Sequence, residues 1–114
     1  MSTITAVVIV LLAAILAAAA IRKLTHREDV VAGYTKVGVP EERLNQLAAI
    51  LLLGAAGLLL GLAWTPIGIA SAAGVVVYFV LAIAAHVRHG DAAHLPTPVT
   101  IEAIAVAALA LQIL

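Results

Sequence analysis

Two ionisable residues, His86 and Glu102, lie within or beside long apolar stretches and are the strongest candidates for chemistry in this sequence. Ionisable side chains inside a membrane are costly and commonly mark ion or ligand sites. A carboxylate beside an imidazole stabilises the protonated ring, so a His86–Glu102 pair can carry a proton or bind a polar headgroup. Two simpler roles stay open: His86 at the membrane–water interface, and Glu102 hydrogen-bonded within a helix bundle.

Two basic residues accompany this pair in the sequence. Lys23 closes the first apolar stretch, and Arg88 follows His86 by two positions. Both should lie at membrane depths close to that of His86 if the apolar stretches are membrane helices. The predicted polar site therefore consists of His86, Glu102, Lys23 and Arg88. Tyr78 is a lone polar group on its apolar stretch, and we expect its hydroxyl to be satisfied inside the bundle.

The sequence contains no established pattern for a metal site or for a catalytic site. One segment contains four side chains of metal-ligating type, His86, His89, Asp91 and His94. Their spacing matches no established ligand pattern, so we predict no metal site. The absence of Cys excludes disulfides and thiolate-bound iron–sulfur clusters. With no phosphate-binding loop and no nucleophile–base pairing, we expect a protein without catalytic residues and without a cofactor, a quinone excepted.

The composition places these residues in a membrane protein. The chain of 114 residues is 65% hydrophobic and 11% charged, whereas a soluble domain is roughly 45–50% apolar and about 25% charged. The uncharged stretch between Arg43 and Arg88 has room for two spans of about 20 residues. Two further apolar stretches flank it. We predict an all-α, integral membrane four-helix bundle forming a single domain, with membrane helices at about residues 4–24, 41–63, 66–87 and 98–114.

The first polar gap predicts one further, shorter helix. Val30, Tyr34 and Val37 share a face over about residues 29–37, Asp29 can cap its start, and Gly38 can end it. A one-sided apolar helix beside a membrane is expected to lie on the interface.

The basic residues predict the orientation. All six Lys and Arg residues fall in the two polar gaps that four crossings place on one side, which the positive-inside rule assigns to the cytoplasm. Both termini are then outside, and the first helix stays uncleaved because its basic residues follow the apolar run. The net charge of zero leaves no basic stripe for nucleic acid. We expect a multi-pass protein of the bacterial inner membrane.

Small residues spaced by four predict where helices touch. In lipid, helices associate by close backbone contact, which small residues permit. Gly57 and Gly61 have this spacing in the second membrane helix, and Gly74 follows Ala70 in the third. They predict packing within the bundle or against a partner helix or second copy.

The whole chain resembles the DoxX-like family of small bacterial membrane proteins. The resemblance rests on residues 21–24 (IRKL), 30–40 (VVAGYTKVGVP), 54–62 (GAAGLLLGL) with the Trp and Pro turn that follows, and 75–91 (VVVYFVLAIAAHVRHGD). It implies a four-helix membrane bundle and, through the namesake of the larger family, a subunit linked to thiosulfate oxidation and quinone reduction. Lys23, His86 and Arg88 match the pattern. The chain departs from it at Leu51, where many relatives carry a Glu, so no role of that carboxylate is carried over.

Three functions are compatible with these features. We favour a non-catalytic membrane subunit or scaffold that assembles with other membrane proteins or itself, in association with a redox, quinone-linked complex. The first alternative is a small proton-coupled transporter that uses Glu102 as its coupling carboxylate. The second is a redox subunit with a quinone- or lipid-binding pocket near His86 and Tyr78.

Overall fold

Five α-helices and two short 3₁₀ turns make up the protein in a computed structural model, which describes residues 2–114. Four helices are long and apolar enough to cross a membrane, as the sequence predicts. In chain order the elements are α1 (Thr3–Leu24), α2 (Glu28–Lys36), η1 (Glu41–Arg43), α3 (Leu44–Leu60), α4 (Thr65–Arg88), η2 (Ala92–His94) and α5 (Pro96–Ile113).

Local sequence signals explain where these elements begin and end. Ser2 caps α1, its hydroxyl accepting a hydrogen bond from the Thr5 amide at 3.1 Å. Prolines lie in the first turns of α4 and α5, where a missing N–H costs nothing. Gly38 follows α2 and Gly90 follows α4, and both have positive φ values, 84° and 66°. That conformation carries no steric penalty for glycine and ends a helix.

Two boundaries of the membrane helices differ by more than one residue from the expected ones. The second membrane helix starts as the 3₁₀ turn η1, and its α-helical part ends at Leu60, after which Leu62 and Ala63 donate hydrogen bonds three residues back. The last helix starts at Pro96 rather than at residue 98. A proline suits the first position of a helix, so α5 gains two residues.

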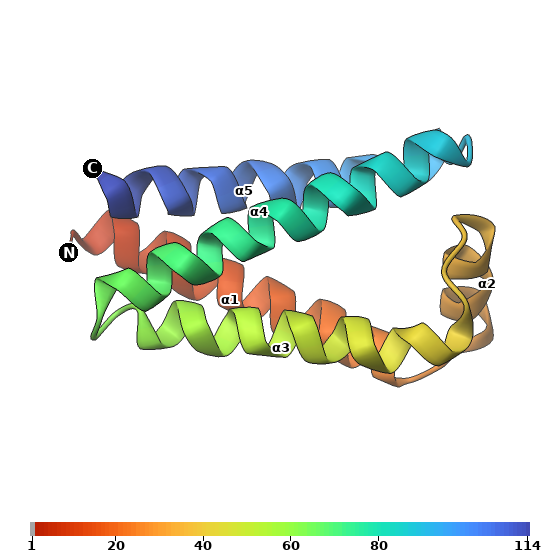
Figure 1. Cartoon of the computed structure of the whole chain (residues 1–114), viewed down its shortest axis with the longest axis horizontal. Helices are drawn as coiled ribbons and strands as arrows, with labels where there is room; N and C mark the ends of the chain where they lie inside the picture. The colour runs from red at the N-terminus through yellow and green to blue at the C-terminus, as the bar shows by residue number, and fades with distance from the viewer. Residues whose placement is uncertain (1) are drawn as a thin grey trace.

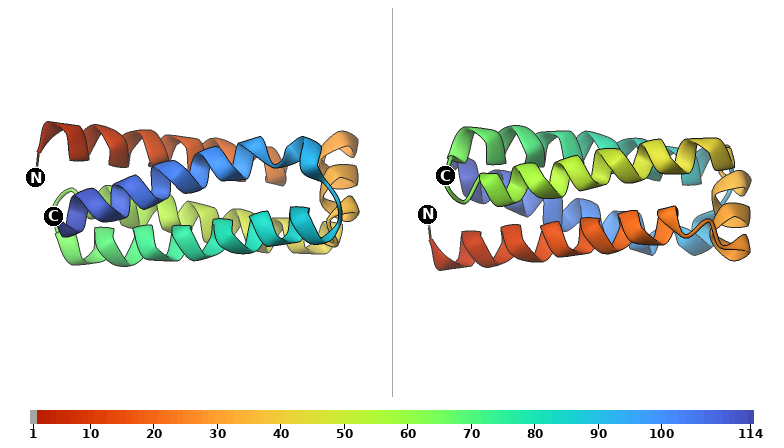
Figure 2. Two further views of the ribbon diagram at one scale, coloured as in Figure 1. Left: turned by 90° about the horizontal axis from the view of Figure 1, so that it is seen from above. Right: turned by 90° about the horizontal axis from the view of Figure 1, so that it is seen from below.

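The four long helices form a ring in which each helix packs against two others. Helix α1 contacts α3 and α5, and α4 contacts the same two helices. The particle measures 41 × 24 × 17 Å. Both termini lie at one end, and α2 lies across the other (Figures 1 and 2). We call the α2 end the basic end, because the six Lys and Arg residues all belong to segments that meet there.

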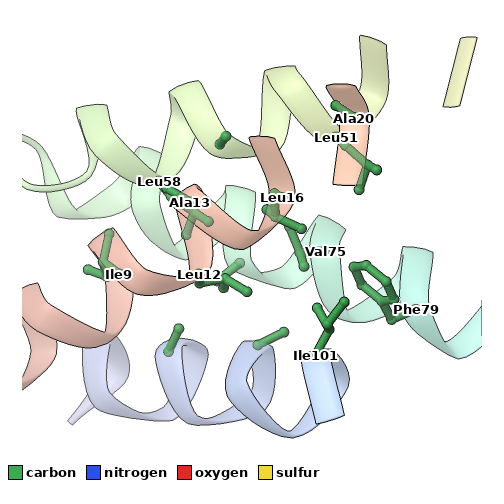
Figure 3. Close-up of a cluster of buried hydrophobic side chains, with 14 of the residues drawn as sticks. Ile9, Leu12, Ala13, Leu16, Ala20, Leu51, Leu58, Val75, Phe79 and Ile101 are labelled. Carbon is green, nitrogen blue, oxygen red and sulfur yellow. The ribbon is translucent and has the colours of Figure 1, made fainter. Parts of the chain in front are cut away.

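The interior of the ring is filled by aliphatic side chains and one phenylalanine. Each of the four helices contributes at least one large side chain to this cluster (Figure 3). The large residues include Ile9, Leu12, Leu16, Leu51, Leu58, Val75, Phe79 and Ile101. Many other Leu, Ile and Val side chains point outward and are exposed. Such an outer surface suits lipid, which makes this a multi-pass membrane protein.

Glycines bring α3 and α4 close together near the turn that joins them. A Cβ added to Gly61 would lie 2.9 Å from the Gly68 amide nitrogen, and one added to Gly57 would overlap Ser71 Oγ. Gly74 behaves differently. It is exposed, with nothing within 4 Å of the position of its missing Cβ. Gly74 therefore lies on the outer face of α4 and makes no contact inside the bundle, while its predicted contact with a partner helix or a second copy stays a prediction.

Candidate ligand pocket at the basic end

A cavity of about 220 Å³ lies at the basic end, between the helix ends and α2. Helices α1, α4 and α5 form its walls, and α2 contributes residues from across the end of the bundle. The apolar part of the lining comprises Ala19, Val30, Phe79, Ala82, Pro98 and Ile101. The polar part consists of Arg22, Lys23, Asp29, Tyr34, Tyr78, His86, Asp91, His94 and Thr97. One site thus combines aromatic, cationic and acidic groups.

Helix α2 covers this cavity with its apolar face. Val30 is 3% exposed, and Val37, which directly follows the helix, is buried to the same extent. The sequence predicted that this face lies on the membrane interface. The structure adds that the protein itself covers it, because the helix ends of the bundle leave apolar surface that α2 can bury.

Lys23 is the most unusual charged residue of the lining. A lysine at a helix end commonly extends its ammonium into water, yet Lys23 is only 5% exposed. Its ammonium lies 4.8 Å from the centroid of the Tyr34 ring, a cation–π contact. Within residues 2–114, no carboxylate lies within 4.0 Å of this ammonium. The stem of Lys23 is therefore packed, while its ammonium keeps some accessible surface and has no anionic partner among the described residues.

Asp91 is the centre of a polar cluster that joins α2 to the α4–α5 connection. Its side chain is 1% exposed, and Oδ1 accepts hydrogen bonds from His94 Nδ1 at 2.7 Å and from Lys36 Nζ at 3.3 Å. The hydrogen bond from His94, assisted by Lys36, lowers the pKa of Asp91 below its ordinary value of 3.8, although burial acts in the opposite direction. Asp91 thus holds α2 in place over the cavity.

His86 faces this cluster rather than Glu102. Its Nδ1 donates to the Ala82 carbonyl at 2.7 Å, which leaves Nε2 on the side of Asp91, 3.9 Å from Oδ2. Glu102 does not belong to the cavity lining, and neither of its carboxylate oxygens has a hydrogen-bond partner within the described chain. The expected His86–Glu102 pair is therefore not formed. Asp91, five residues from His86 across the helix end, takes the place assigned to Glu102.

The four predicted site residues divide into two groups. Lys23 and His86 line the cavity, whereas Arg88 is exposed and, like Glu102, lies outside the lining. Helical rotation explains why Arg88 lies outside the lining, because Arg88 is two residues, or about 200°, from His86 on α4. Residues 2–114 contain no group of three His, Cys, Asp or Glu side chains that could hold a metal ion.

Sequence reasoning missed Tyr34 and Lys36 as parts of the site. Both lie on α2, and their partners Lys23 and Asp91 come from α1 and from the loop after α4. Lys36 and Asp91 are 55 positions apart in the chain. The available signal was the helical spacing of Val30 and Tyr34, which predicts that both side chains face the same neighbour.

The model of the DoxX-like family matches residues 7–108, which is most of the chain. The chain belongs to the DoxX-like family. The match spans all four membrane helices and α2, so the residues of the cavity lie inside the family region of this DoxX-like chain. No curated protein and no solved structure matched it.

Proposed function

We propose that this DoxX-like protein is a non-catalytic subunit of the bacterial inner membrane that binds an amphiphilic small molecule at its basic end. The observation that carries the proposal is the cavity beneath α2, whose lining joins apolar walls to hydrogen-bond donors. Ligand sites typically combine a mostly apolar lining with a few polar groups that fix orientation. The positive-inside rule puts this cavity on the cytoplasmic side.

The size and lining of the cavity suit the headgroup of a quinone or a lipid. Its volume of about 220 Å³ is below the roughly 300–1,000 Å³ of drug-sized sites, so a ring or headgroup fits while a long tail stays outside. Tyr78 and Phe79 form an edge-to-face pair with ring centroids 4.9 Å apart, which offers an aromatic wall. Lys23 and the two tyrosine hydroxyls are the donors that would hold a carbonyl oxygen. A bound quinone would supply two-electron redox chemistry to a partner protein.

A titration with a short-chain ubiquinone tests this function. We expect saturable binding to the protein purified in mild detergent, monitored by calorimetry. Ala82→Phe adds bulk to the cavity wall and should weaken binding by about tenfold or more. Val80→Phe adds the same bulk to the same helix, but at a position exposed on the outer surface, and should leave binding unchanged. The absence of binding to the unmodified protein would contradict the proposal.

The subunit role requires a partner. Outward-facing apolar residues and the open Gly74 surface leave the outside of the bundle free for another membrane protein or a second copy. Cross-linking in native membranes, followed by purification in mild detergent, should recover this chain in a larger assembly. Recovery of a lone monomer after efficient cross-linking would contradict the subunit role.

A second candidate function, proton-coupled transport, is favoured by one observation on Glu102. Both carboxylate oxygens of this membrane-helix residue are covered and lack a partner in residues 2–114. Such a costly arrangement is a common mark of ion pathways. Proteoliposomes with an imposed proton gradient should then accumulate a cationic dye, and Glu102→Gln should abolish accumulation. Proton-coupled transport would be contradicted if the unmodified protein and Glu102→Gln accumulated the dye equally, or if neither accumulated it.

A further inference from the structure

We propose that the cavity at the basic end selects an anionic ligand, a negatively charged group carried on an apolar ring or chain, and that Lys23 binds the charged group. The inference rests on the proposed function, since it assumes that the cavity holds a ligand. It goes further by assigning the charge of that ligand and the residue that recognises it.

The Lys23 ammonium lies at the cavity wall without an anionic partner in residues 2–114. The Lys23 side chain lines the cavity and is 5% exposed. Its Nζ is not among the fully buried atoms that lack a partner, so the ammonium stays accessible from the cavity. Its closest recorded partner is the face of the Tyr34 ring, at 4.8 Å from the centroid. A ring face attracts a cation but provides no oxygen acceptor, so this ammonium remains able to receive an anion from the cavity.

The acids of the lining already have partners. Asp91 accepts hydrogen bonds from His94 and Lys36, and Asp29 lies 3.4 Å from Arg27 Nε. The two histidines of the lining, His86 and His94, face Asp91. The two permanent cations of the lining lack such partners, because neither Arg22 nor Lys23 is within 4.0 Å of a carboxylate of residues 2–114. The uncompensated charge of the cavity wall is therefore positive, which favours an anion over a neutral or cationic ligand.

The apolar part of the cavity lining determines what the rest of the ligand must contain. Phe79 and Tyr78 stack edge to face in the wall, and Val30, Ala82 and Ile101 add aliphatic surface. A bare inorganic ion would leave this surface in contact with water. A ligand with an apolar body covers it, and the charged group can then reach Lys23. Aromatic carboxylates and anionic phospholipid headgroups on their acyl chains share this chemistry.

Two matched probes test the charge preference. 2-Naphthoate and 2-naphthamide have nearly the same shape and differ in charge, so their dissociation constants for the protein in phosphatidylcholine nanodiscs isolate the electrostatic contribution. We expect naphthoate to bind about tenfold or more tightly, as charge-assisted hydrogen bonds do relative to neutral ones. Equal affinities would overturn the inference while leaving the proposed function intact. Failure of both probes to bind would overturn the inference, while the ubiquinone titration decides the proposed function separately.

Three variants assign the preference to Lys23. Lys23→Met keeps the length of the side chain and should remove the preference for naphthoate, whereas Lys23→Arg should retain it. Arg88→Met removes a base from the same end of the molecule but outside the cavity, and should leave the preference unchanged. A preference that survives Lys23→Met would overturn the assignment. If Lys23→Met does not fold, Lys23→Arg still tests the assignment. Loss of the preference for naphthoate in Lys23→Arg, which keeps the positive charge, would overturn the assignment to Lys23.

Short-chain lipids distinguish the two sources of the anion. Dihexanoyl phosphatidylglycerol should displace naphthoate from the detergent-solubilised protein if a lipid headgroup is the natural ligand, and dihexanoyl phosphatidylcholine should not. Displacement by neither lipid, with naphthoate still preferred over naphthamide, supports a soluble aromatic acid. Equal displacement by both lipids, at equal affinity, would show that the site ignores charge and would overturn the inference.

Discussion

At the scale of single residues, His26 joins three segments of the chain at the basic end. Its φ of 52° is the only positive value among the non-glycine residues described, 2–114. Nδ1 lies 3.0 Å from Glu41 Oε2, and Nε2 lies 2.7 Å from Asn45 Oδ1. Both neighbours are acceptors, so the imidazole satisfies both only when each ring nitrogen carries a proton. The hydrogen bond to Asn45, followed by that to Glu41, raises the pKa of His26 above its ordinary value of 6.5.

This arrangement predicts a pH dependence of stability. A group whose pKa is higher in the folded protein stabilises it fully below the unfolded pKa and loses that contribution as the pH rises through the folded pKa. The free energy of unfolding should therefore fall as the pH rises above the ordinary His pKa of 6.5 and through the higher pKa of the folded protein. His26→Asn removes the titrating ring but tolerates positive φ, and should flatten the fall. Denaturant unfolding at several pH values measures the effect, and identical profiles for both proteins would contradict it.

Also at this scale, the sequence identified part of the pocket and not its pairing. Lys23 and His86 were predicted as site residues and both line the cavity. The partner expected for His86 was Glu102, because residues at similar membrane depth were assumed to face each other. Depth follows from position along a helix, but facing depends on helix rotation and on loop geometry. The turn at Gly90 folds Asp91 back toward His86, and its backbone amide donates to the His86 carbonyl at 2.8 Å.

At the scale of the elements, glycines set the distance between α3 and α4. The Gly61 position faces the Gly68 backbone, with no room for a methyl group, whereas the Gly74 position is open. In the sequence, the four-residue spacing of small residues predicted helix packing equally at Gly61 and at Gly74. Spacing defines a stripe along a helix, but it does not tell whether that stripe faces a neighbouring helix or lipid.

The two glycines give a matched pair of substitutions. Gly61→Ala should lower the free energy of unfolding by about 1–3 kcal/mol, because the new methyl group must push α3 and α4 apart. Gly74→Ala should be neutral or stabilising by up to about 1 kcal/mol, because alanine favours the helix and meets nothing. Unfolding of both variants in mixed detergent micelles measures the difference. A loss of stability for Gly74→Ala that equals that for Gly61→Ala would contradict the packing described above.

At the scale of the whole molecule, the membrane class and the four helices could be predicted from composition and hydrophobic length. A helix that crosses a lipid bilayer must be long and apolar, so these features can be recognised directly in the sequence. The cavity could not be predicted, because it exists only where α2 folds across the ends of α1, α4 and α5 (Figure 2). The contact between Lys36 and Asp91 that holds α2 there joins residues 55 positions apart. Only the assembled bundle brings them together.

The central claim is that a ligand occupies the cavity under α2, and thiol protection tests it most directly. The chain has no Cys, so Ala82→Cys in the cavity wall and Arg88→Cys outside it each introduce a single reactive thiol. We predict that saturating 2-naphthoate slows maleimide labelling of Ala82→Cys severalfold and leaves labelling of Arg88→Cys unchanged. Unchanged labelling of Ala82→Cys at a naphthoate concentration that saturates binding would show that the ligand lies elsewhere and would contradict the account.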